Sequence, residues 1–245
     1  MSRGVLVTGA SRGIGRAIAS AFAENGDRVA VHYSSRREEA EKTLAGLAGA
    51  GHVLVGGDVA TPDGAAAVVA QAVEALDTVH VLVNNAAVNL PHPLPSTDYE
   101  QWQQVWRQTV DVNLLGTAHV SYCAARHMIE RGVPGRIVNV GSRGAFRGEP
   151  DHPAYGATKA AAQAMGQSLA VSLAPYGIAV ASVAPGFVAT ERVADRLTDE
   201  VRSQSPFGRV AEPAEIAAAV RYLASAEAVW SSGAVLDVNG ASYLH

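Results

Sequence analysis

Cysteine, lysine and long apolar runs are all scarce in this sequence of 245 residues. The one cysteine, Cys123, cannot form an internal disulfide, which excludes a disulfide framework and is typical of a reducing compartment. No apolar run approaches the roughly 20 residues of a membrane-spanning helix, and the N-terminus has no long apolar region ahead of a signal cleavage site. We therefore expect a cytoplasmic protein without a membrane partner.

Positive charge is spread thinly along the chain. Arginine supplies nearly all of it, because Lys42 and Lys159 are the only lysines, and the formal net charge is -4. Without a basic stripe or a lysine-rich block, we expect no nucleic-acid partner. No group of His, Cys, Asp and Glu has the spacing of metal ligands, so we expect no catalytic metal. The composition, 48% hydrophobic and 17% charged, predicts one globular domain over residues 1–245.

Short apolar runs rich in β-branched residues alternate with longer, alanine-rich segments of helical pattern. The predicted strands are Gly4–Val7, Arg28–Tyr33, Val53–Val55, Val79–Val83, Arg136–Val140, Ile178–Val183 and Ala234–Val238. The predicted helices are Gly13–Asn25, Arg36–Ala50, Pro62–Leu76, Tyr99–Arg131 (one helix or two), Tyr155–Pro175 and Pro213–Leu223. This order predicts an α/β fold, a doubly wound (Rossmann) parallel sheet of about seven strands with helices on both faces.

Two segments lack a steady strand or helix pattern. Asn89–Ser96 is dense in proline, and Gly186–Pro213 carries Pro206 and Gly208. Both follow predicted strands, so they belong to the rim where a doubly wound sheet binds its ligand. We expect residues 186–213 to form a substrate loop or lid.

Three glycines separate the first predicted strand from the first predicted helix. In VLVTGASRGIGRAIA, Gly9 permits a sharp turn, Gly13 permits close approach to a phosphate, and Gly15 permits the helix to pack on the sheet. The helix N-terminus then offers free N–H groups to an anion. The spacing is G-x-x-x-G-x-G rather than the usual G-x-G-x-x-G, and a purely structural turn is the alternative. Its place after the first buried strand favours dinucleotide binding.

The end of the second predicted strand indicates which dinucleotide binds. An acidic residue there would hold a ribose 2′-hydroxyl, but this chain reads RVAVHYSSRRE, with no carboxylate before Glu38. Arginine forks suit phosphate. We interpret Arg12, Ser35 and Arg36 as a site for a 2′-phosphate, which predicts NADP(H) in preference to NAD(H). The alternative is that Arg36 and its neighbour only begin a solvated helix.

Tyr155 and Lys159 stand four residues apart, on one face of a predicted helix. Tyrosine ordinarily titrates near ~10, and a nearby ammonium lowers the pKa by favouring the phenolate. Ser142, just past the strand RIVNV, lies on the rim where this helix begins. Its hydroxyl is placed to hold a carbonyl oxygen while Tyr155 donates a proton. An ordinary helix pair and a turn serine are the alternatives.

The ordered set of motifs resembles the short-chain dehydrogenase/reductase family, in its single-domain branch, over essentially the whole chain. TGASRGIG (8–15) looks like that family's cofactor loop, and Asn84-Asn85-Ala86 looks like its Asn-Asn-Ala-Gly motif. The family's catalytic tetrad is matched in order by Asn113, Ser142, Tyr155 and Lys159. The resemblance implies cofactor contacts from Gly9, Ser11, Arg12, Gly13, Ile14, Gly15, Ser34, Ser35, Arg36, Asp58, Val59, Asn85, Ala86, Ala87, Tyr155, Lys159, Pro185, Gly186, Val188 and Thr190.

The same resemblance implies the chemical roles. Tyr155 is the general acid for ketone reduction, Ser142 positions the carbonyl, and Lys159 binds the nicotinamide ribose and lowers the tyrosine's pKa. Asn113 holds a water in a proton relay. The family commonly forms tetramers through the helix after Asn113 and the alanine-rich helix after Tyr155, so we expect a homotetramer.

Two positions depart from the family pattern. Ala87 replaces a usual glycine, and we expect tighter packing near the cofactor rather than loss of binding. Overall the chain is most similar to 3-oxoacyl-[acyl-carrier-protein] reductases, which dock an acidic carrier protein on basic residues. Tyr176 stands near one of those places with no lysine around it, which argues against carrier docking.

Three functions remain open on the sequence. The first is NADPH-dependent reduction of a ketone, such as a 3-oxoacyl thioester or a related carbonyl. The second is oxidation of a secondary alcohol, a sugar or a steroid, and the third is a non-catalytic dinucleotide sensor. His92 and His152 flank rim segments and are expected to be incidental, with a substrate contact as the alternative. Arg143 and Arg147 are expected to be exposed on a loop, with recognition of a polar or anionic substrate as the alternative. Trp102 and Trp106 are expected to pack in the core or between subunits, with substrate stacking as the alternative.

Overall fold

Seven parallel strands form the centre of the molecule, in a computed structural model that describes residues 2–191 and 197–244. The strands are β1 (Gly4–Val7), β2 (Arg28–Tyr33), β3 (Val53–Gly56), β4 (Val81–Asn84), β5 (Gly135–Val140), β6 (Ile178–Pro185) and β7 (Val235–Val238). They lie in the order β3-β2-β1-β4-β5-β6-β7 and pair in parallel throughout. The predicted doubly wound sheet is therefore confirmed, and its direction of winding reverses between β1 and β4.

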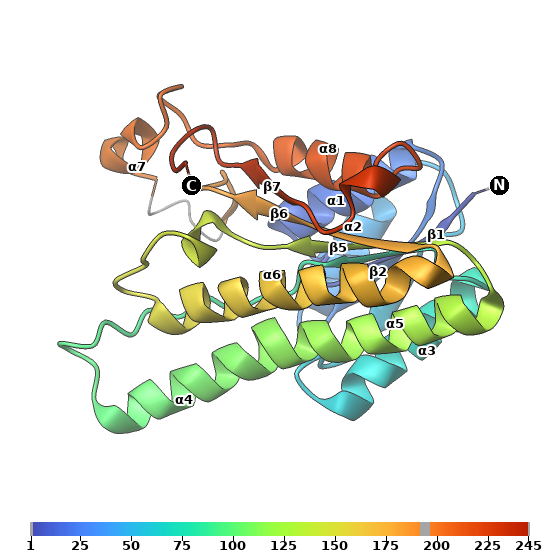
Figure 1. Cartoon of the computed structure of the whole chain (residues 1–245), viewed down its shortest axis with the longest axis horizontal. Helices are drawn as coiled ribbons and strands as arrows, with labels where there is room; N and C mark the ends of the chain where they lie inside the picture. Colours follow the sequence, from blue (N-terminus) through green and yellow to red (C-terminus); the bar gives the residue numbers. More distant parts are fainter. Residues whose placement is uncertain (1, 192–196, 245) are drawn as a thin grey trace.

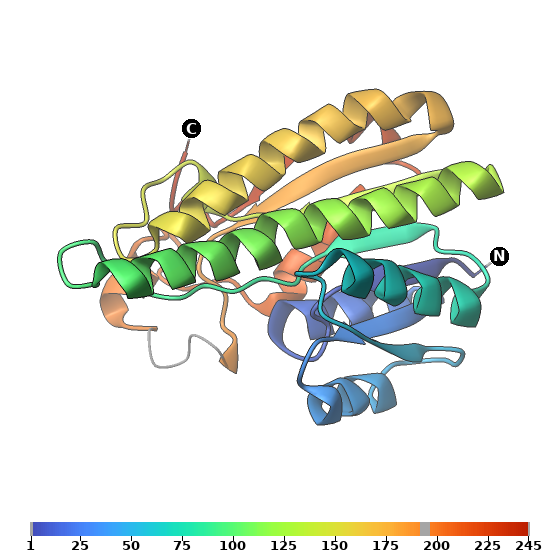
Figure 2. The ribbon, with the colours of Figure 1, turned by 90° about the horizontal axis from the view of Figure 1, so that it is seen from below.

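Helices cover both faces of this sheet. They are α1 (Gly13–Glu24), α2 (Arg37–Ala45), α3 (Pro62–Leu76), α4 (Tyr99–Val110), α5 (Thr117–Arg131), α6 (Pro153–Leu173), α7 (Asp199–Ser203) and α8 (Pro213–Leu223). Figure 1 shows α1 and α8 together above the sheet, with α6 and the α4–α5 rod below it. Figure 2, from below, shows that α4 and α5 run on as one long rod beside α6.

The core is divided between the two faces because successive side chains of a strand point in opposite directions. In β1, Val5 and Val7 pack with α1 and α8, whereas Leu6 packs with α3 and α5. All three are fully buried, and each contributes on the order of 1.5–3 kcal/mol by leaving water. The buried strands thus act as a fixed frame from whose carboxyl ends the site loops start.

The structure refines three sequence expectations. The segment 99–131 is continuous but holds one π-helical turn, η1 (Asp111–Gly116), between α4 and α5. Helix α2 ends at Ala45, five residues before the predicted end, with Gly46 as its C-cap residue, and glycine is a poor helix former. A short helix, α7, lies within 186–213 and is capped by Thr198. Within the described residues, no helix is long and apolar enough to cross a membrane.

Candidate active site

A cleft of about 670 Å³ lies beyond the carboxyl ends of β1 and β4, at the point where the sheet reverses direction. Twenty of the predicted catalytic and cofactor residues line it: Gly9, Ser11, Arg12, Gly13, Ile14, Gly15, Ser34, Ser35, Arg36, Asp58, Val59, Asn85, Ala86, Ala87, Ser142, Tyr155, Lys159, Pro185, Gly186 and Thr190. Two others do not. Val188 is buried in the core and bridges to Ala211, and Asn113 is buried and hydrogen-bonded to Val88, which lines the cleft.

The glycine loop has no room for side chains at two of its glycines. Gly9 has φ +63°, and a Cβ there would lie 2.9 Å from the Ala86 Cα. A Cβ at Gly15 would lie 2.3 Å from the Gly9 carbonyl oxygen. The N-terminus of α1 has no side-chain cap and no acidic residue in its first turn. Bare N–H groups beside a tight backbone turn fit the phosphates of a dinucleotide.

Asn85 and Thr8 hold the loop against the end of β4. The Asn85 amide nitrogen donates to the carbonyl oxygens of Thr8 (2.9 Å) and Gly9 (3.0 Å). The Thr8 hydroxyl oxygen accepts from the backbone N–H groups of Asn85 (2.9 Å) and Ala86 (3.0 Å). The Asn-Asn-Ala motif therefore positions the phosphate-binding turn by hydrogen bonds to its backbone.

His32 holds the loop from the other side, and sequence reasoning missed it. Its Nδ1 accepts from the Gly9 N–H at 3.0 Å, so the ring proton is on Nε2, which lies 3.0 Å from the Gly57 carbonyl oxygen. Burial lowers the pKa of His32, against smaller opposing effects of the Gly57 hydrogen bond and the Asp58 charge. The ring is thus kept neutral and able to accept. A polar residue in the otherwise apolar strand RVAVHY was the available signal.

Arginines near the glycine loop and the end of β2 fall into two groups. Arg16 pairs with Glu39 and Glu191, and Arg37 pairs with Glu41. Arg12 and Arg36 line the cleft and form no ion pair within the described part of the chain. Arg36 is the exposed N-cap residue of α2, so the helix-start alternative stays open for it, and both Arg12 and Arg36 are placed where they could meet an anion.

Ser142, Tyr155 and Lys159 come together at the middle of the cleft. Ser142 follows β5, and its Oγ accepts from the Gly144 N–H at 3.0 Å. Tyr155 lies in the first turn of α6, and the Lys159 ammonium is 5.7 Å from the centre of its ring. That ammonium is buried and donates to the Val140 carbonyl oxygen at 2.7 Å. A buried positive charge beside a tyrosine stabilises negative charge on the phenol oxygen.

Asn113 lies in the π-helical turn that interrupts the long rod. Its side-chain oxygen accepts from the Val88 N–H at 2.8 Å, and its nitrogen donates to the Val88 carbonyl oxygen at 2.9 Å and to Thr158 Oγ1 at 3.2 Å. The side chain therefore fixes the segment after β4 against α6. A π turn is often found at functional positions, and nothing in the helical pattern of the sequence indicates it.

Comparison with known proteins decides the family. A family model described as enoyl-(acyl carrier protein) reductase matches residues 9–241. The chain belongs to the short-chain dehydrogenase/reductase family. Members of this family use NAD(P)(H) and act on CH–OH and C=O groups.

Relatives in the family differ in substrate. The chain is similar to the 3-oxoacyl-[acyl-carrier-protein] reductase FabG of Staphylococcus aureus, with 35% identity over 100% of this chain and 99% of the relative. It is similar to an L-rhamnose 1-dehydrogenase (NAD(P)(+)) of Azotobacter vinelandii, with 37% identity over 98% and 96%. A crystal structure of a short chain dehydrogenase from Bacillus anthracis superposes with a TM-score of 0.87 at 30% identity, covering 99% and 97%.

The substrate side of this dehydrogenase/reductase corrects one expectation and adds a structural contact. His92 is buried, accepts from the Ala154 N–H at 3.2 Å and packs edge-on against Trp102 with ring centres 5.3 Å apart, and it is not among the residues that line the cleft. Arg143, expected to be exposed, is 4% exposed. His92 thus joins the proline-rich loop to the start of α6, and Arg143 is held by Gln204 and Ser242.

Two further features complete the substrate side. Asn89 lines the cleft, and its Oδ1 is buried without a hydrogen-bond partner among the described residues. An unpaired acceptor at such a position suits a ligand O–H or N–H. In the expected lid, 186–213, residues 192–196 lie outside the described residues. Elsewhere in the described chain no group of three His, Cys, Asp or Glu side chains is arranged to hold a metal.

Proposed function

We propose that this chain is an NADP(H)-dependent oxidoreductase, one domain over residues 1–245, that reduces a ketone to a secondary alcohol. The observation that carries the proposal is the meeting of Ser142, Tyr155 and the buried Lys159 in the cleft that holds the glycine loop. Nicotinamide, when bound, supplies the hydride for the carbonyl carbon. The task left to the protein is to orient the carbonyl and to deliver a proton to its oxygen.

Tyr155 is the proposed general acid, and its two neighbours divide the remaining work. Because the Ser142 oxygen accepts from Gly144, its O–H is left to donate to the carbonyl oxygen. The Lys159 ammonium stabilises the phenolate that remains after Tyr155 has given up its proton. The Asn113 side chain bonds to Val88 and Thr158, which supports a part in positioning the segment after β4, and its predicted part in holding a water stays a prediction.

The preference for NADP(H) over NAD(H) is supported by charge at the end of β2. Arg12 and Arg36 offer guanidinium groups without ion pairs to the cleft. Ser34 and Ser35 stand where an acidic residue would hold a ribose hydroxyl. A phosphate there would find two cations and a hydroxyl, whereas a bare ribose would find no carboxylate acceptor.

Oxidation of a polyol or sugar is the second candidate, and Asn89 favours it. Its unpaired Oδ1 would accept a hydrogen bond from a substrate hydroxyl. The similarity to a rhamnose dehydrogenase supports the same direction. The proposed residues serve both directions, because Tyr155 takes the proton back when an alcohol is oxidised.

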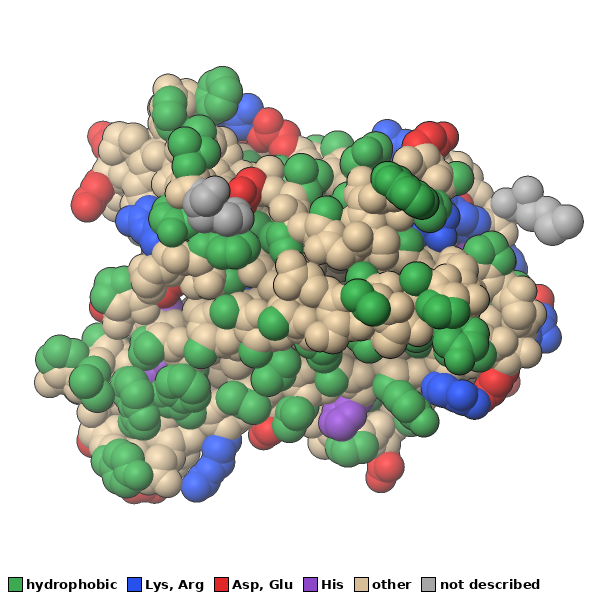
Figure 3. Space-filling view, viewed as in Figure 1, with side chains coloured by type: hydrophobic (Ala, Val, Ile, Leu, Met, Phe, Trp, Pro, Cys, Tyr) green, Lys and Arg blue, Asp and Glu red, His purple; other side chains and the backbone are tan. Residues whose placement is uncertain are grey.

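Assembly into a homotetramer is supported by the outer face of α5 and α6. Tyr122 on α5 is 68% exposed and Val171 on α6 is 79% exposed. Figure 3 shows hydrophobic side chains scattered over this face, with charged ones mostly toward its edges. Light scattering of the purified chain tests the oligomeric state.

Docking of an acyl carrier protein is not part of the proposal. Tyr176, which stands near the place where such a docking lysine would be expected, is exposed.

The function is tested by following the NADPH absorbance band with a panel of substrates in both directions. The reductive panel holds a 3-oxoacyl thioester, a cyclic diketone, a quinone and a steroid ketone. The oxidative panel, with NADP⁺, holds secondary alcohols and aldoses. Turnover in either panel supports the proposal and selects the direction, and NADPH binding with no turnover in either panel contradicts it.

A further inference from the structure

A second cavity, of about 320 Å³, lies behind the cleft wall. The wall is made by two pairs of consecutive residues. Ser142 and Gly186 line the cleft, while Arg143 and Phe187 line the second cavity. A Cβ on Gly186 would lie 3.2 Å from atoms of Asn239 and Ser242, two residues that line the second cavity, so the backbone of Gly186 packs closely against that lining. No lining residue is shared.

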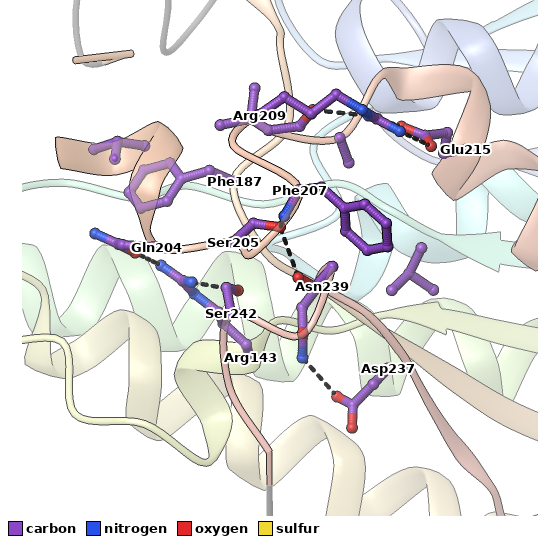
Figure 4. A pocket seen from close by; sticks show the side chains of 15 residues that line it. Arg143, Phe187, Gln204, Ser205, Phe207, Arg209, Glu215, Asp237, Asn239 and Ser242 are labelled. Carbon is purple, nitrogen blue, oxygen red and sulfur yellow. Dashed lines mark hydrogen bonds and ion pairs between the residues drawn. The ribbon is translucent and has the colours of Figure 1, made fainter. Parts of the chain in front are cut away.

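Arg143 brings a buried positive charge to this cavity. Its guanidinium donates to Ser242 Oγ and to Gln204 Oε1 and lies 5.1 Å from the centre of the Phe187 ring, as Figure 4 shows for the labelled side chains. All of these partners are neutral. Burial lowers the pKa of Arg143, the nearby Arg147 charge lowers it further, and Glu149 raises it. A buried arginine remains charged, and a buried charge without a counter-ion is costly.

The acidic residues of the cavity are engaged elsewhere. Both oxygens of Glu215 accept from Arg209, at 2.7 and 2.8 Å, and this pairing lowers the pKa of Glu215 to about 2. Asp237 accepts from the Asn239 side chain at 3.2 Å. Arg143 therefore forms no ion pair with any carboxylate in the described part of the chain.

The lining also includes apolar side chains beside its polar and charged ones. Phe187, Val201, Phe207 and Val210 contribute side chains to it. Phe207 is 75% exposed even though it is a large hydrophobic residue at the cavity wall. An exposed phenyl ring near a buried guanidinium offers a surface for a molecule with an apolar body and an anionic end.

We propose that this cavity is a second ligand site, which binds a small organic carboxylate with an apolar body. The carboxylate meets the Arg143 fork, a bidentate geometry that guanidinium favours. The apolar body lies against Phe187 and Phe207. The proposal is independent of the proposed reaction, because the lining residues are distinct from those of the cleft.

Calorimetric titration of the full chain with octanoate tests the site. Octan-1-ol lacks the charge and acetate lacks the apolar body, so each is expected to bind at least about tenfold more weakly than octanoate. Arg143→Gln is expected to weaken octanoate binding by at least about tenfold. Arg147→Gln is the matched control, since Arg147 also donates to Gln204, at 3.4 Å, but does not line the cavity.

Phe207→Ala provides a second variant if Arg143→Gln does not fold, as an exposed side chain can be shortened with little effect on stability. It is expected to weaken octanoate binding by several-fold and to leave acetate unchanged. Saturating NADPH is expected to leave octanoate binding in place. The proposal is overturned if octanoate does not bind, if both cavity variants bind it as the wild type does, or if NADPH abolishes the binding.

Discussion

The two walls of the cleft are built in different ways. On the nucleotide wall, the backbone of Thr8 and Gly9 is hydrogen-bonded to the side chains of Asn85 and His32, and the Thr8 hydroxyl accepts from the backbone of Asn85. All of these residues belong to strands or follow them directly. On the substrate wall, single side chains such as His92 and Arg143 tie irregular segments to their neighbours. One wall is fixed by backbone geometry, and the other depends on the particular side chains this chain carries.

The difference between a wall fixed by backbone geometry and a wall fixed by side chains determines which wall can be predicted from the sequence. A turn that requires glycine is marked by a glycine in the sequence, so the nucleotide wall can be predicted from the sequence. A loop held by a buried arginine is marked in the sequence only by that arginine. Because most arginines are exposed, the sequence does not predict that this one is buried. The same division fits the family, whose members share a cofactor, bound by the nucleotide wall, and differ in substrate, bound by the substrate wall.

The largest effect is expected where the two walls meet. Tyr155→Phe removes the proposed acid and is expected to lower kcat by about 10²- to 10⁴-fold, with NADPH affinity nearly unchanged. Steady-state rates and a binding titration measure the two quantities. Tyr176→Phe is the matched control, because Tyr176 is exposed and outside the cleft. A Tyr155→Phe variant that retains full turnover would remove the assigned acid.

The backbone character of the nucleotide wall is tested by two glycines with the same φ of +63°. Gly132 has nothing within 4 Å of its missing side chain, so Gly132→Ala is expected to cost about 1–2 kcal/mol of unfolding free energy. Gly9→Ala adds a clash with Ala86, and we expect a further loss of about 1–3 kcal/mol together with weaker NADPH binding. Denaturant unfolding measures both, and equal losses would show that the loop has room to spare.

Charge at the far end of the nucleotide wall is tested by two adjacent arginines. Arg36→Asp is expected to weaken NADPH binding by about 10- to 100-fold and to affect NADH much less. Arg37→Asp makes the same charge change in a residue already paired with Glu41, at 2.8 Å. It is expected to alter NADPH affinity only weakly. Similar losses in both variants would point to general electrostatic attraction instead of a phosphate contact.

The smallest effect concerns His32. Its pKa is lowered in the fold, so below the unfolded value of 6.5 the unfolded chain binds the extra proton and stability falls as pH falls. Above that value both states are neutral and the effect is absent. His32→Asn is expected to reduce the loss between pH 7.5 and 5.5, by at most about 1.4 kcal/mol per pH unit. Identical pH dependence in variant and wild type would show that His32 titrates alike in both states.

Much of the architecture was predictable because it rests on periodicity. Buried apolar runs and glycine-bounded helices predict the sheet and the position of the glycine loop, and the structure confirms them. The π turn at Asn113, the His32 clamp and the burial of Arg143 were not predictable. Each depends on contacts between segments far apart in the chain, such as 143 with 204 and 242.

The most direct test of the account is the affinity of the wild-type chain for NADPH against NADH, measured by fluorescence titration without substrate. The nucleotide wall, with Arg12 and Arg36 free to meet a 2′-phosphate, predicts that NADPH binds at least about tenfold more tightly. Equal affinity, or tighter binding of NADH, would contradict that assignment.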